Sequence, residues 1–357
     1  MGLGSINTYS LAEARSRAAE VRKIVSAGRD PISERDADRQ RIKLTTAMAM
    51  TFDECADAYI EAHRAGWKNP KHVTQWENTL ATYASPVIGS LPVASVDMPL
   101  ALKILEPIWT TKNETASRLR GRIEAVLDWA TVRGYRSGEN PARWKGHLDK
   151  VLPAPNKVQK VKHHPALPYA QVGEFMAALR NCEGIAAKAL EFTILTAARS
   201  GEVRGAEWQE IDLRAKTWTI PAERMKAGKE HRIPLSDAAV KLLQLMPRLK
   251  DEAHVFPSPQ NTALSDMSLM AVLRRMGRKD LTVHGFRSTF RDWAGETTPF
   301  PREVIEHALA HQLRDKAEAA YQRGDLLVKR ERLMQTWADY CNKVQTVSNV
   351  TPIREMA

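Results

Sequence analysis

Apolar residues recur every three or four positions over most of the chain, which predicts a mainly helical protein. The clearest pattern lies in residues 47–152, where we expect four helices. The first begins near Thr51, the second covers about residues 70–83, and the fourth covers residues 115–133. Proline and glycine in residues 86–92 predict a break before the third helix. Each long helix has one apolar stripe, so we expect an independent helical domain.

The residues before this domain have a different pattern. The first ten residues look like the end of a strand, and a helix is expected from Ser10, where Ser10 and Glu13 fit a capping box. Gly28 and the Asp-Pro pair that follows it predict the end of this helix. The charged stretch 34–48 is expected to be a linker. Residues 1–46 therefore predict one amphipathic helix with a strand stub, which cannot bury its apolar stripe alone.

The second half of the chain mixes helical runs with short strands. A stretch rich in Pro and Lys, residues 153–168, predicts a linker between domains. A further domain is expected over residues 169–343, in which two helical runs lead to strands within 211–220 and 231–235 that form a hairpin. Residues 344–357 form a tail. The expected fold class is mainly α with a small antiparallel β-sheet (α+β).

Candidate chemistry is concentrated in residues 282–321. His284 and Arg287 lie one helical turn apart, His311 follows a second helical run, and Tyr321 comes ten residues later. A guanidinium beside an imidazole suits a phosphate group, and a tyrosine hydroxyl can attack phosphorus. The alternative is a solvated helix face and a tyrosine ring that is simply buried.

Two upstream positions extend this candidate site. Arg199 stands before a Ser-Gly break, where it can point into a pocket and be held by Glu202. Lys226 lies at the hairpin turn, where an ammonium group can protonate a leaving alkoxide. The alternatives are a structural Arg–Glu pair and a solvated lysine.

Composition favours a polyanionic partner. The 357 residues include 53 Lys and Arg against 42 Asp and Glu, a net charge of +11. Three separated cysteines without a C-x-x-C spacing suit a reducing cytoplasm and argue against zinc, and His163 with His164 reads as a solvated pair rather than a metal site. No apolar run approaches the roughly 20 residues of a membrane helix, and no secretory signal opens the chain.

The polar faces of the helical domain are candidates for contact with DNA. Lys71 and Gln75 lie opposite the apolar stripe of the second helix, and Arg118 and Arg122 flank the stripe of the fourth. Lysine and arginine in such positions neutralise backbone phosphates. For any single residue, an ordinary solvated face is the alternative.

The order of the motifs resembles the tyrosine recombinase family, in particular the phage- and island-type integrases related to the P4 integrase. The motifs are ILTAARSGEVRGAEW, RMKAGKEHRIPLS, VHGFRSTFRDWA, LAH and AAY, and GWKNPKHVTQWENTL and ETASRLRGRIEAVLDWA resemble the core-binding domain of that subgroup. The resemblance implies a catalytic set, braced by Glu202, in which Lys229 competes with Lys226 for the lysine role. The implied set is Arg199, Lys226, His284, Arg287, His311 and the nucleophile Tyr321.

The resemblance also implies a function. The chain is expected to be a site-specific recombinase that cuts and rejoins DNA through a 3′-phosphotyrosyl intermediate, without a cofactor or metal, to integrate and excise a prophage or genomic island. Its expected partners are double-stranded attachment sites, on which it is expected to form a homotetramer. An accessory DNA-bending or directionality factor is a possible further partner. The expected location is the bacterial cytoplasm. A non-catalytic DNA-binding protein and a topoisomerase-like relaxing enzyme are the alternatives.

Both ends of the chain qualify this resemblance. Such integrases begin with an arm-binding domain of several strands and a helix, and residues 1–46 resemble only the last strand and helix of it. A misassigned start codon, decay of the element or a short form of the integrase would each explain this remnant. After Tyr321, an apolar helical stripe includes Leu333, Trp337 and Tyr340. Such a stripe needs a partner surface, either on its own domain or on a neighbouring subunit.

Overall fold

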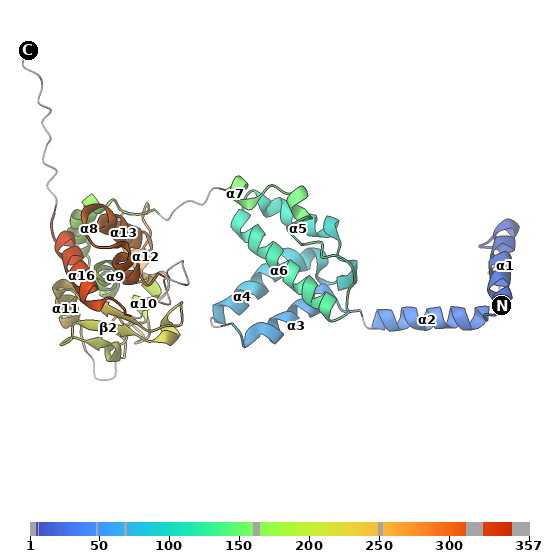
Figure 1. Ribbon diagram of the computed structural model, residues 1–357, viewed down its shortest axis with the longest axis horizontal. Coiled ribbons are helices and arrows are strands. Elements are labelled where there is room, and N and C mark those ends of the chain that lie inside the picture. Colours follow the sequence, from blue (N-terminus) through green and yellow to red (C-terminus); the bar gives the residue numbers. More distant parts are fainter. Residues whose placement is uncertain are drawn as a thin grey trace, which may run out of the picture. The chain divides into compact units, whose positions relative to one another are not determined.

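The computed structural model divides into two compact units, Met1–Val161 and Lys162–Ala357 (Figure 1). The residues that the structure describes are Ser5 and the ranges 7–47, 49–67, 70–159, 165–248, 253–311 and 324–344, without the side chains of residues 41–47 and 70. The boundary between the units falls inside the stretch 153–168 that the sequence indicates as a linker.

The first unit opens with two helices, α1 (Leu11–Ser26) and α2 (Pro31–Ala47). The capping box of Ser10 and Glu13 is confirmed. Two expectations are wrong. The described residues before Ser10 form a turn rather than a strand, because the backbone N–H groups of Thr8 and Tyr9 donate to the Ser5 carbonyl. The expected linker is largely α2, because Asp30 accepts hydrogen bonds from the backbone N–H groups of Ile32 and Ser33 and thereby caps a new helix.

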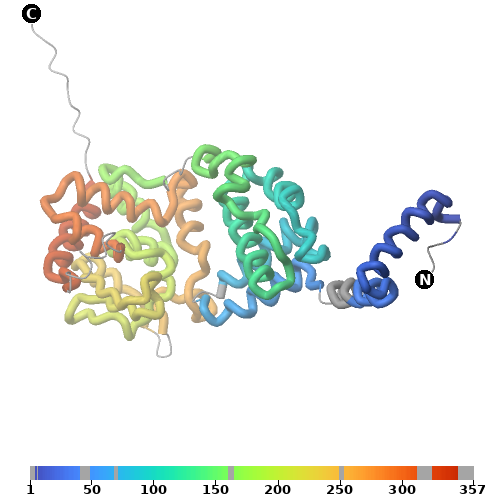
Figure 2. Tube along the Cα trace, turned by 45° about the vertical axis from the view of Figure 1, so that its right-hand side comes forward, coloured from blue at the N-terminus to red at the C-terminus, as the bar shows by residue number. Residues whose placement is uncertain are grey.

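The helices expected over residues 47–152 are present in the first unit (Figure 2). Its elements are α3 (Phe52–Arg64), α4 (Pro70–Thr79), the π-helix η1 (Leu80–Gly89), the 3-10 helices η2 (Val93–Ser95) and η3 (Leu148–Lys150), α5 (Met98–Trp109), α6 (Asn113–Val132) and α7 (Pro155–Val158). Pro86 does not break the chain as expected, because it lies inside the π-helical segment. Gly89 allows the close approach of α3: a Cβ there would lie 2.2 Å from an Asp53 carboxylate oxygen.

The second unit is mainly helical around one small sheet, which confirms the expected fold class. Its helices are α8 (Val172–Arg180), α9 (Ile185–Thr196), α10 (Ser200–Arg204), α11 (Asp237–Gln244), α12 (Ser268–Arg275), α13 (Gly285–Thr297), α14 (Arg302–Ala308) and α16 (Leu327–Cys341), with 3-10 turns η4 (Tyr169–Gln171), η5 (Trp208–Glu210) and η6 (Ala222–Arg224). The sheet is antiparallel, in the order β1 (Ile211–Asp212), β2 (Thr217–Ile220) and β3 (His231–Pro234).

Helix α9 is the centre of the second unit. Every residue from Ala189 to Thr196 is buried, and α8, α10, α11, α12 and α16 pack against the helix. The helix ends at Ala197 (φ 50°), in the left-handed region. Ala197 and Ala198 are themselves buried, so the chain enters the candidate site from inside the core.

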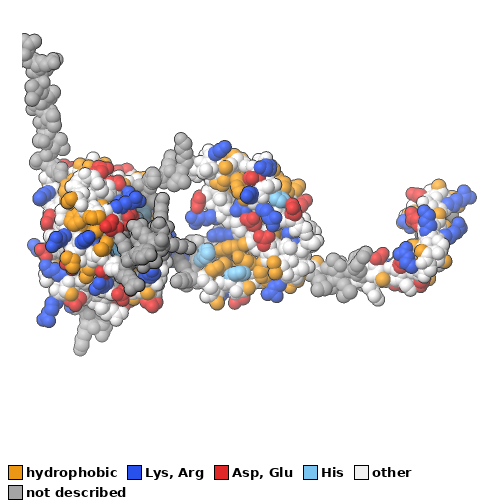
Figure 3. All heavy atoms as spheres, in the orientation of Figure 1, with side chains coloured by type: hydrophobic (Ala, Val, Ile, Leu, Met, Phe, Trp, Pro, Cys, Tyr) orange, Lys and Arg blue, Asp and Glu red, His pale blue; other side chains and the backbone are white. Residues whose placement is uncertain are grey.

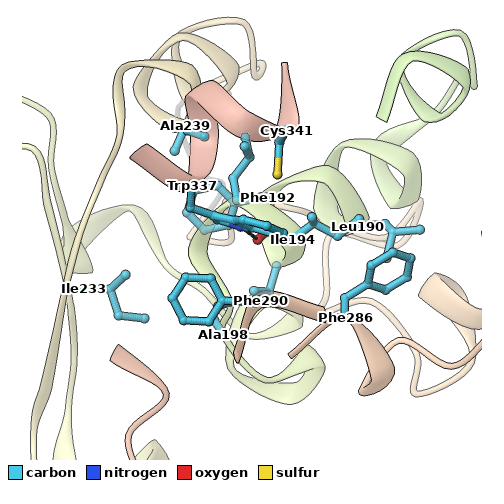
Figure 4. Close-up of a cluster of buried hydrophobic side chains, with 14 of the residues drawn as sticks. Leu190, Phe192, Ile194, Ala198, Ile233, Ala239, Phe286, Phe290, Trp337 and Cys341 are labelled. Atoms are coloured by element: carbon cyan, nitrogen blue, oxygen red, sulfur yellow. Dashed lines mark hydrogen bonds between the residues drawn. The ribbon is translucent and has the colours of Figure 1, made fainter. Parts of the chain in front are cut away.

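The apolar stripe of α16 packs on its own unit (Figure 4). Trp337 is 0% exposed, and its indole N–H donates to the Ile194 carbonyl at 2.8 Å. Its ring centroid lies 5.4 Å from that of Phe290 and 4.9 Å from that of Trp293. Of the two surfaces considered for this stripe, its own domain is therefore the one that covers Trp337.

We expect Trp337→Ala to lower the free energy of unfolding by about 3–5 kcal/mol, because it removes a buried ring and leaves a cavity. Urea denaturation of the full chain measures this loss, with Val328→Ala as the control because Val328 is exposed on the same helix. Wild-type stability combined with lost subunit assembly in Trp337→Ala would instead assign the ring to a contact between subunits.

Both ends of the stretch 153–168 pack on the units that they adjoin. Trp109 donates from its indole N–H to the Pro153 carbonyl, and Val158 packs against the first core. Leu167 is buried in the second core, and its carbonyl accepts the Thr289 hydroxyl. Residues 160–164, which contain the paired histidines, lie outside the described residues. Among the described helices, none is both long and apolar enough to cross a membrane.

Candidate active site

Arg199 is held by the turn that follows α9. It is the N-cap residue of α10, and its backbone N–H donates to the Glu202 carboxylate at 2.8 Å. Its guanidinium Nη1 donates to the other oxygen of Glu202 at 2.6 Å, and Nη2 donates to the Ala310 carbonyl at 3.2 Å. The predicted contact between Arg199 and Glu202 is therefore present. Since Glu202 is buried, this pair fixes the direction of the guanidinium.

Arg287 occupies the buried side of α13 and is 5% exposed. Its Nη1 donates to the Ala197 carbonyl and its Nη2 to the Leu309 carbonyl. Burial first, and then the charge of Arg199, lower the pKa of Arg287 to about 10, so the group is still charged at neutral pH. Because Leu309 and Ala310 are consecutive, their carbonyls hold the two guanidinium groups as neighbours.

His311 joins this pair from the end of α14. Its Nε2 lies 3.4 Å from Nη2 of Arg287, and its Nδ1 lies 2.6 Å from a carboxylate oxygen of Glu306. Glu306 also accepts from Nε of Arg291 at 3.0 Å. Burial acts to raise the pKa of Glu306, but the hydrogen bonds from His311 and Arg291 outweigh it and the net shift is downward. Glu306 was missed by the sequence analysis, although it lies five residues before His311 in the motif EHALAH.

His284 is the exposed N-cap residue of α13, one turn before Arg287. The two arginines of this helix point in different directions, because Arg287 is buried in the core whereas Arg291 is exposed and pairs with Glu306. The structure thus brings Arg199, Arg287 and His311 together and places His284 at the start of the same helix. Tyr321 lies outside the described residues.

Lys226 and Lys229 are both exposed in the loop between β2 and β3, as the hairpin predicts. The base of this loop is fixed by Arg224, which the sequence analysis missed. Arg224 Nη1 pairs with the buried carboxylate of Glu210, and Nη2 donates to the Glu202 carbonyl at 2.5 Å. The lysine loop is therefore tied to the same short helix that carries Glu202.

His231, also missed, is a mostly buried histidine at the start of β3. Burial first, and then the positive charges of Arg330, Arg199 and Arg287, lower the pKa of His231 to about 4. Its Nε2 is buried and has no hydrogen-bond partner among the described residues. In the sequence it was marked only as the first residue of the strand His-Arg-Ile-Pro.

His231 makes stability depend on pH. Its folded-state pKa lies below the usual value of 6.5, so between about pH 6.5 and 4 the unfolded chain binds the proton and the folded chain does not. Stability is therefore lost as the pH falls through this window, by up to about 3 kcal/mol. We expect His231→Gln to remove this part of the loss, which denaturation at pH 7 and pH 4.5 measures. An equal loss in both proteins would contradict the burial of a neutral His231.

The four residues predicted to face DNA, all in the first unit, differ in their exposure to solvent. Lys71, Gln75 and Arg118 are exposed, and Arg118 pairs with Glu114 at 2.7 Å. Arg122 is only 8% exposed, and its Nη1 donates to the Gln75 carbonyl at 2.6 Å. The expectation of a solvent-facing Arg122 is therefore corrected, because this side chain ties α6 to α4. Figure 3 shows Lys and Arg interspersed with Asp and Glu on the visible faces of both units.

We expect Arg122→Ala to affect mainly stability and Arg118→Ala to affect mainly DNA binding. Arg122→Ala leaves a carbonyl without its donor and lowers the free energy of unfolding by about 1–3 kcal/mol. Arg118→Ala changes stability by less than about 0.5 kcal/mol but weakens DNA binding and reduces its salt slope by about one. Urea denaturation and binding titrations at several salt concentrations measure both. If Arg122→Ala kept the wild-type stability and its DNA binding lost one unit of salt slope, Arg122 would be a phosphate contact after all.

The assembled site is a cluster of cationic donors held by carbonyls and carboxylates. Two guanidinium groups fixed on consecutive carbonyls, with an imidazole beside them, present several N–H donors in one place. Such an arrangement suits a tetrahedral anion with more than one oxygen to bind, such as a phosphodiester. Among the described residues, no group of three or more His, Cys, Asp or Glu side chains is placed to hold a metal ion.

Comparison with known proteins gives the class of this fold. A lambda integrase tetramer bound to a Holliday junction has a TM-score of 0.60 at 16% identity, over 88% of this chain and 90% of that chain. The Tn1549 transposon integrase bound to transposon right end DNA has a TM-score of 0.56 at 15% identity, over 80% and 99%. The fold is that of the tyrosine recombinases.

Sequence comparison then gives the family. Residues 52–147 match the phage integrase central domain, and residues 166–324 match the phage integrase family. Prophage integrase IntZ of Escherichia coli (strain K12) is 30% identical over 96% of this chain and 83% of its own length. The integrase of Enterobacteria phage P4 is 29% identical over 95% and 79%. The chain belongs to the phage integrase family and is a tyrosine-type site-specific recombinase.

Proposed function

We propose that Arg199, Arg287 and His311 bind the scissile phosphodiester of an attachment site, that Tyr321 is the nucleophile and that His284 assists the transfer of its proton. The observation that carries this proposal is the convergence of Arg199 and Arg287 on the carbonyls at the end of α14, with His311 beside Arg287. These groups come from three segments that are distant in the sequence.

The proposed reaction conserves the phosphodiester bond energy. The Tyr321 hydroxyl oxygen attacks phosphorus, and its proton passes to a neighbouring base, for which we propose His284. The bond from phosphorus to O5′ breaks, and the leaving oxygen takes a proton from Lys226 or Lys229 in the exposed loop. Arg199 and Arg287 stabilise the charge that develops on the non-bridging oxygens. A 5′-hydroxyl of the partner duplex then attacks the phosphotyrosine and releases the enzyme.

The same proposal covers the partners. The net charge of +11 suits double-stranded DNA, and the lambda integrase relative was solved as a tetramer on a Holliday junction. We infer that this chain assembles as a homotetramer on paired sites, with Lys71, Gln75 and Arg118 of the first unit facing DNA. It acts in the bacterial cytoplasm, on the nucleoid, to integrate and excise a prophage or genomic island, and an accessory DNA-bending or directionality factor sets the direction.

Supercoiled plasmids test this function. One plasmid has two copies of the junction sequence that flanks the element, and the control has one copy. A recombinase rearranges only the plasmid with two copies, and deletions or inversions of defined length appear on gels. Relaxation of both plasmids without rearrangement would identify a topoisomerase-like enzyme. Binding without any change in either plasmid would identify a non-catalytic DNA-binding protein.

A further inference from the structure

Glu306 is a carboxylate shared between His311 and the polar edge of α13. Its side chain is only 15% exposed, and its two oxygens take different partners. One accepts from Nε of Arg291 at 3.0 Å, and the other lies 2.6 Å from Nδ1 of His311. Arg302, on the same helix, approaches to 3.9 Å but is itself largely exposed. The contact with His311 is therefore the short one.

This contact determines which ring nitrogen of His311 faces the arginines. An ionised carboxylate only accepts hydrogen bonds, so Nδ1 must hold a proton. The ring is thereby turned so that Nε2 is the atom beside Nη2 of Arg287. A ring with a proton only on Nδ1 cannot donate from Nε2, whereas the imidazolium donates from both nitrogens.

We propose that Glu306 is a positioning residue for the phosphate step, which holds the His311 proton on Nδ1 and turns Nε2 toward Arg287, one of the two arginines that bind the anion. This inference rests on the proposed function, in which Arg199, Arg287 and His311 hold the scissile phosphate. Glu306 acts only through His311 and does not itself contact DNA. A purely structural role, bracing α14 against α13 through Arg291, is the competing explanation.

The rate of covalent adduct formation distinguishes these explanations. The full-length enzyme is mixed in excess with a nicked attachment-site duplex, from which the short 5′-hydroxyl fragment is lost after cleavage. We expect Glu306→Gln to lower the rate about 10- to 100-fold, the order found for carboxylates that orient metal-bound histidines. DNA affinity and thermal stability stay at the wild-type level.

A double-variant cycle and a matched control complete the test. Because Glu306 acts through His311, Glu306→Gln added to His311→Ala should lower the rate no further. Arg291→Gln removes the brace but keeps the His311 contact, so it should keep a rate close to that of the wild type. Additive losses, or the same loss in Arg291→Gln and Glu306→Gln, would overturn the proposal in favour of bracing.

A spectroscopic measurement separates this proposal from the proposed function. The 15N shifts of the His311 ring report which nitrogen holds the proton, with or without catalysis. We expect Nδ1 to be protonated in the wild type and the two tautomers to mix in Glu306→Gln, because an amide can also donate. Wild-type protein that forms no adduct would refute the proposed function alone. Identical ring shifts in the wild type and Glu306→Gln would refute the role of Glu306 alone.

Discussion

Tyr321→Phe is expected to bind attachment-site DNA as tightly as the wild type and to form no covalent adduct at all. The substitution keeps the aromatic ring and removes only the oxygen that would bond to phosphorus, so folding and DNA contacts should persist. The nicked attachment-site duplex traps the wild-type enzyme, and a gel shift measures binding in parallel. Because no other group can replace the missing oxygen, the effect is a complete loss rather than a reduced rate.

Tyr340→Phe is the matched control, because Tyr340 is the rival hydroxyl on the stripe of α16. Its ring centroid lies 5.5 Å from that of Trp293, and burial raises the pKa of its hydroxyl. Both features suit packing rather than attack on phosphorus. Mass spectrometry of the trapped wild-type adduct identifies the linked peptide. A DNA-linked peptide that contains Tyr340 and not Tyr321 would reverse the assignment.

Helical periodicity predicted the first unit well because it reports burial directly. Val73, Trp76 and Leu80 recur at helical spacing, and all three are buried in the core. The end of the first helix before Asp30 and Pro31 was predicted correctly, but residues 34–48 were not recognised as helical, since an Asp-Pro pair can end one helix or cap the next. Only the residues that follow decide between these outcomes, and here they continue as α2.

Position beside an apolar stripe was not enough to assign Arg118 and Arg122. Both flank the stripe of α6, but one is exposed and the other reaches inward to the Gln75 carbonyl. A long arginine side chain at the edge of a stripe can extend either way, and the choice depends on whether a neighbouring helix offers an acceptor. That acceptor is 47 residues away in the sequence, so no local pattern reveals it.

The sequence predicted which residues form the candidate site, but not the contacts that hold them in place. The resemblance of the motifs supplied Arg199, Arg287 and His311, and the local Arg199–Glu202 pair could be expected from its spacing. Backbone carbonyls and a carboxylate that no motif marks hold the site together. Arg287 binds carbonyls 90 residues before it and 22 residues after it, so these contacts exist only once the unit has folded. Glu306 joins the cluster through His311 and Arg291, and His231 lies close enough for the charges of Arg199 and Arg287 to lower its pKa.

The second large effect is expected at Arg287, where chemistry and folding can be separated by the choice of substitution. Arg287→Ala removes the charge and leaves the carbonyls of Ala197 and Leu309 without their donor, so it should lower stability as well as cleavage. Arg287→Lys keeps a positive charge and can still donate to one carbonyl. It loses the planar fork that can hold a carbonyl and a phosphate oxygen together.

We therefore expect Arg287→Lys to fold and to bind site DNA like the wild type, yet to form the covalent adduct about 100- to 1,000-fold more slowly, which corresponds to about 3–4 kcal/mol of lost transition-state stabilisation. Single-turnover adduct formation measures the rate, and thermal unfolding checks the fold. Arg302→Lys is the control, because Arg302 is exposed on α14 and should keep the wild-type rate. If Arg287→Lys cleaved within tenfold of the wild type, the fork would not be required, and Arg287 would serve mainly to hold the turn after α9 against the end of α14.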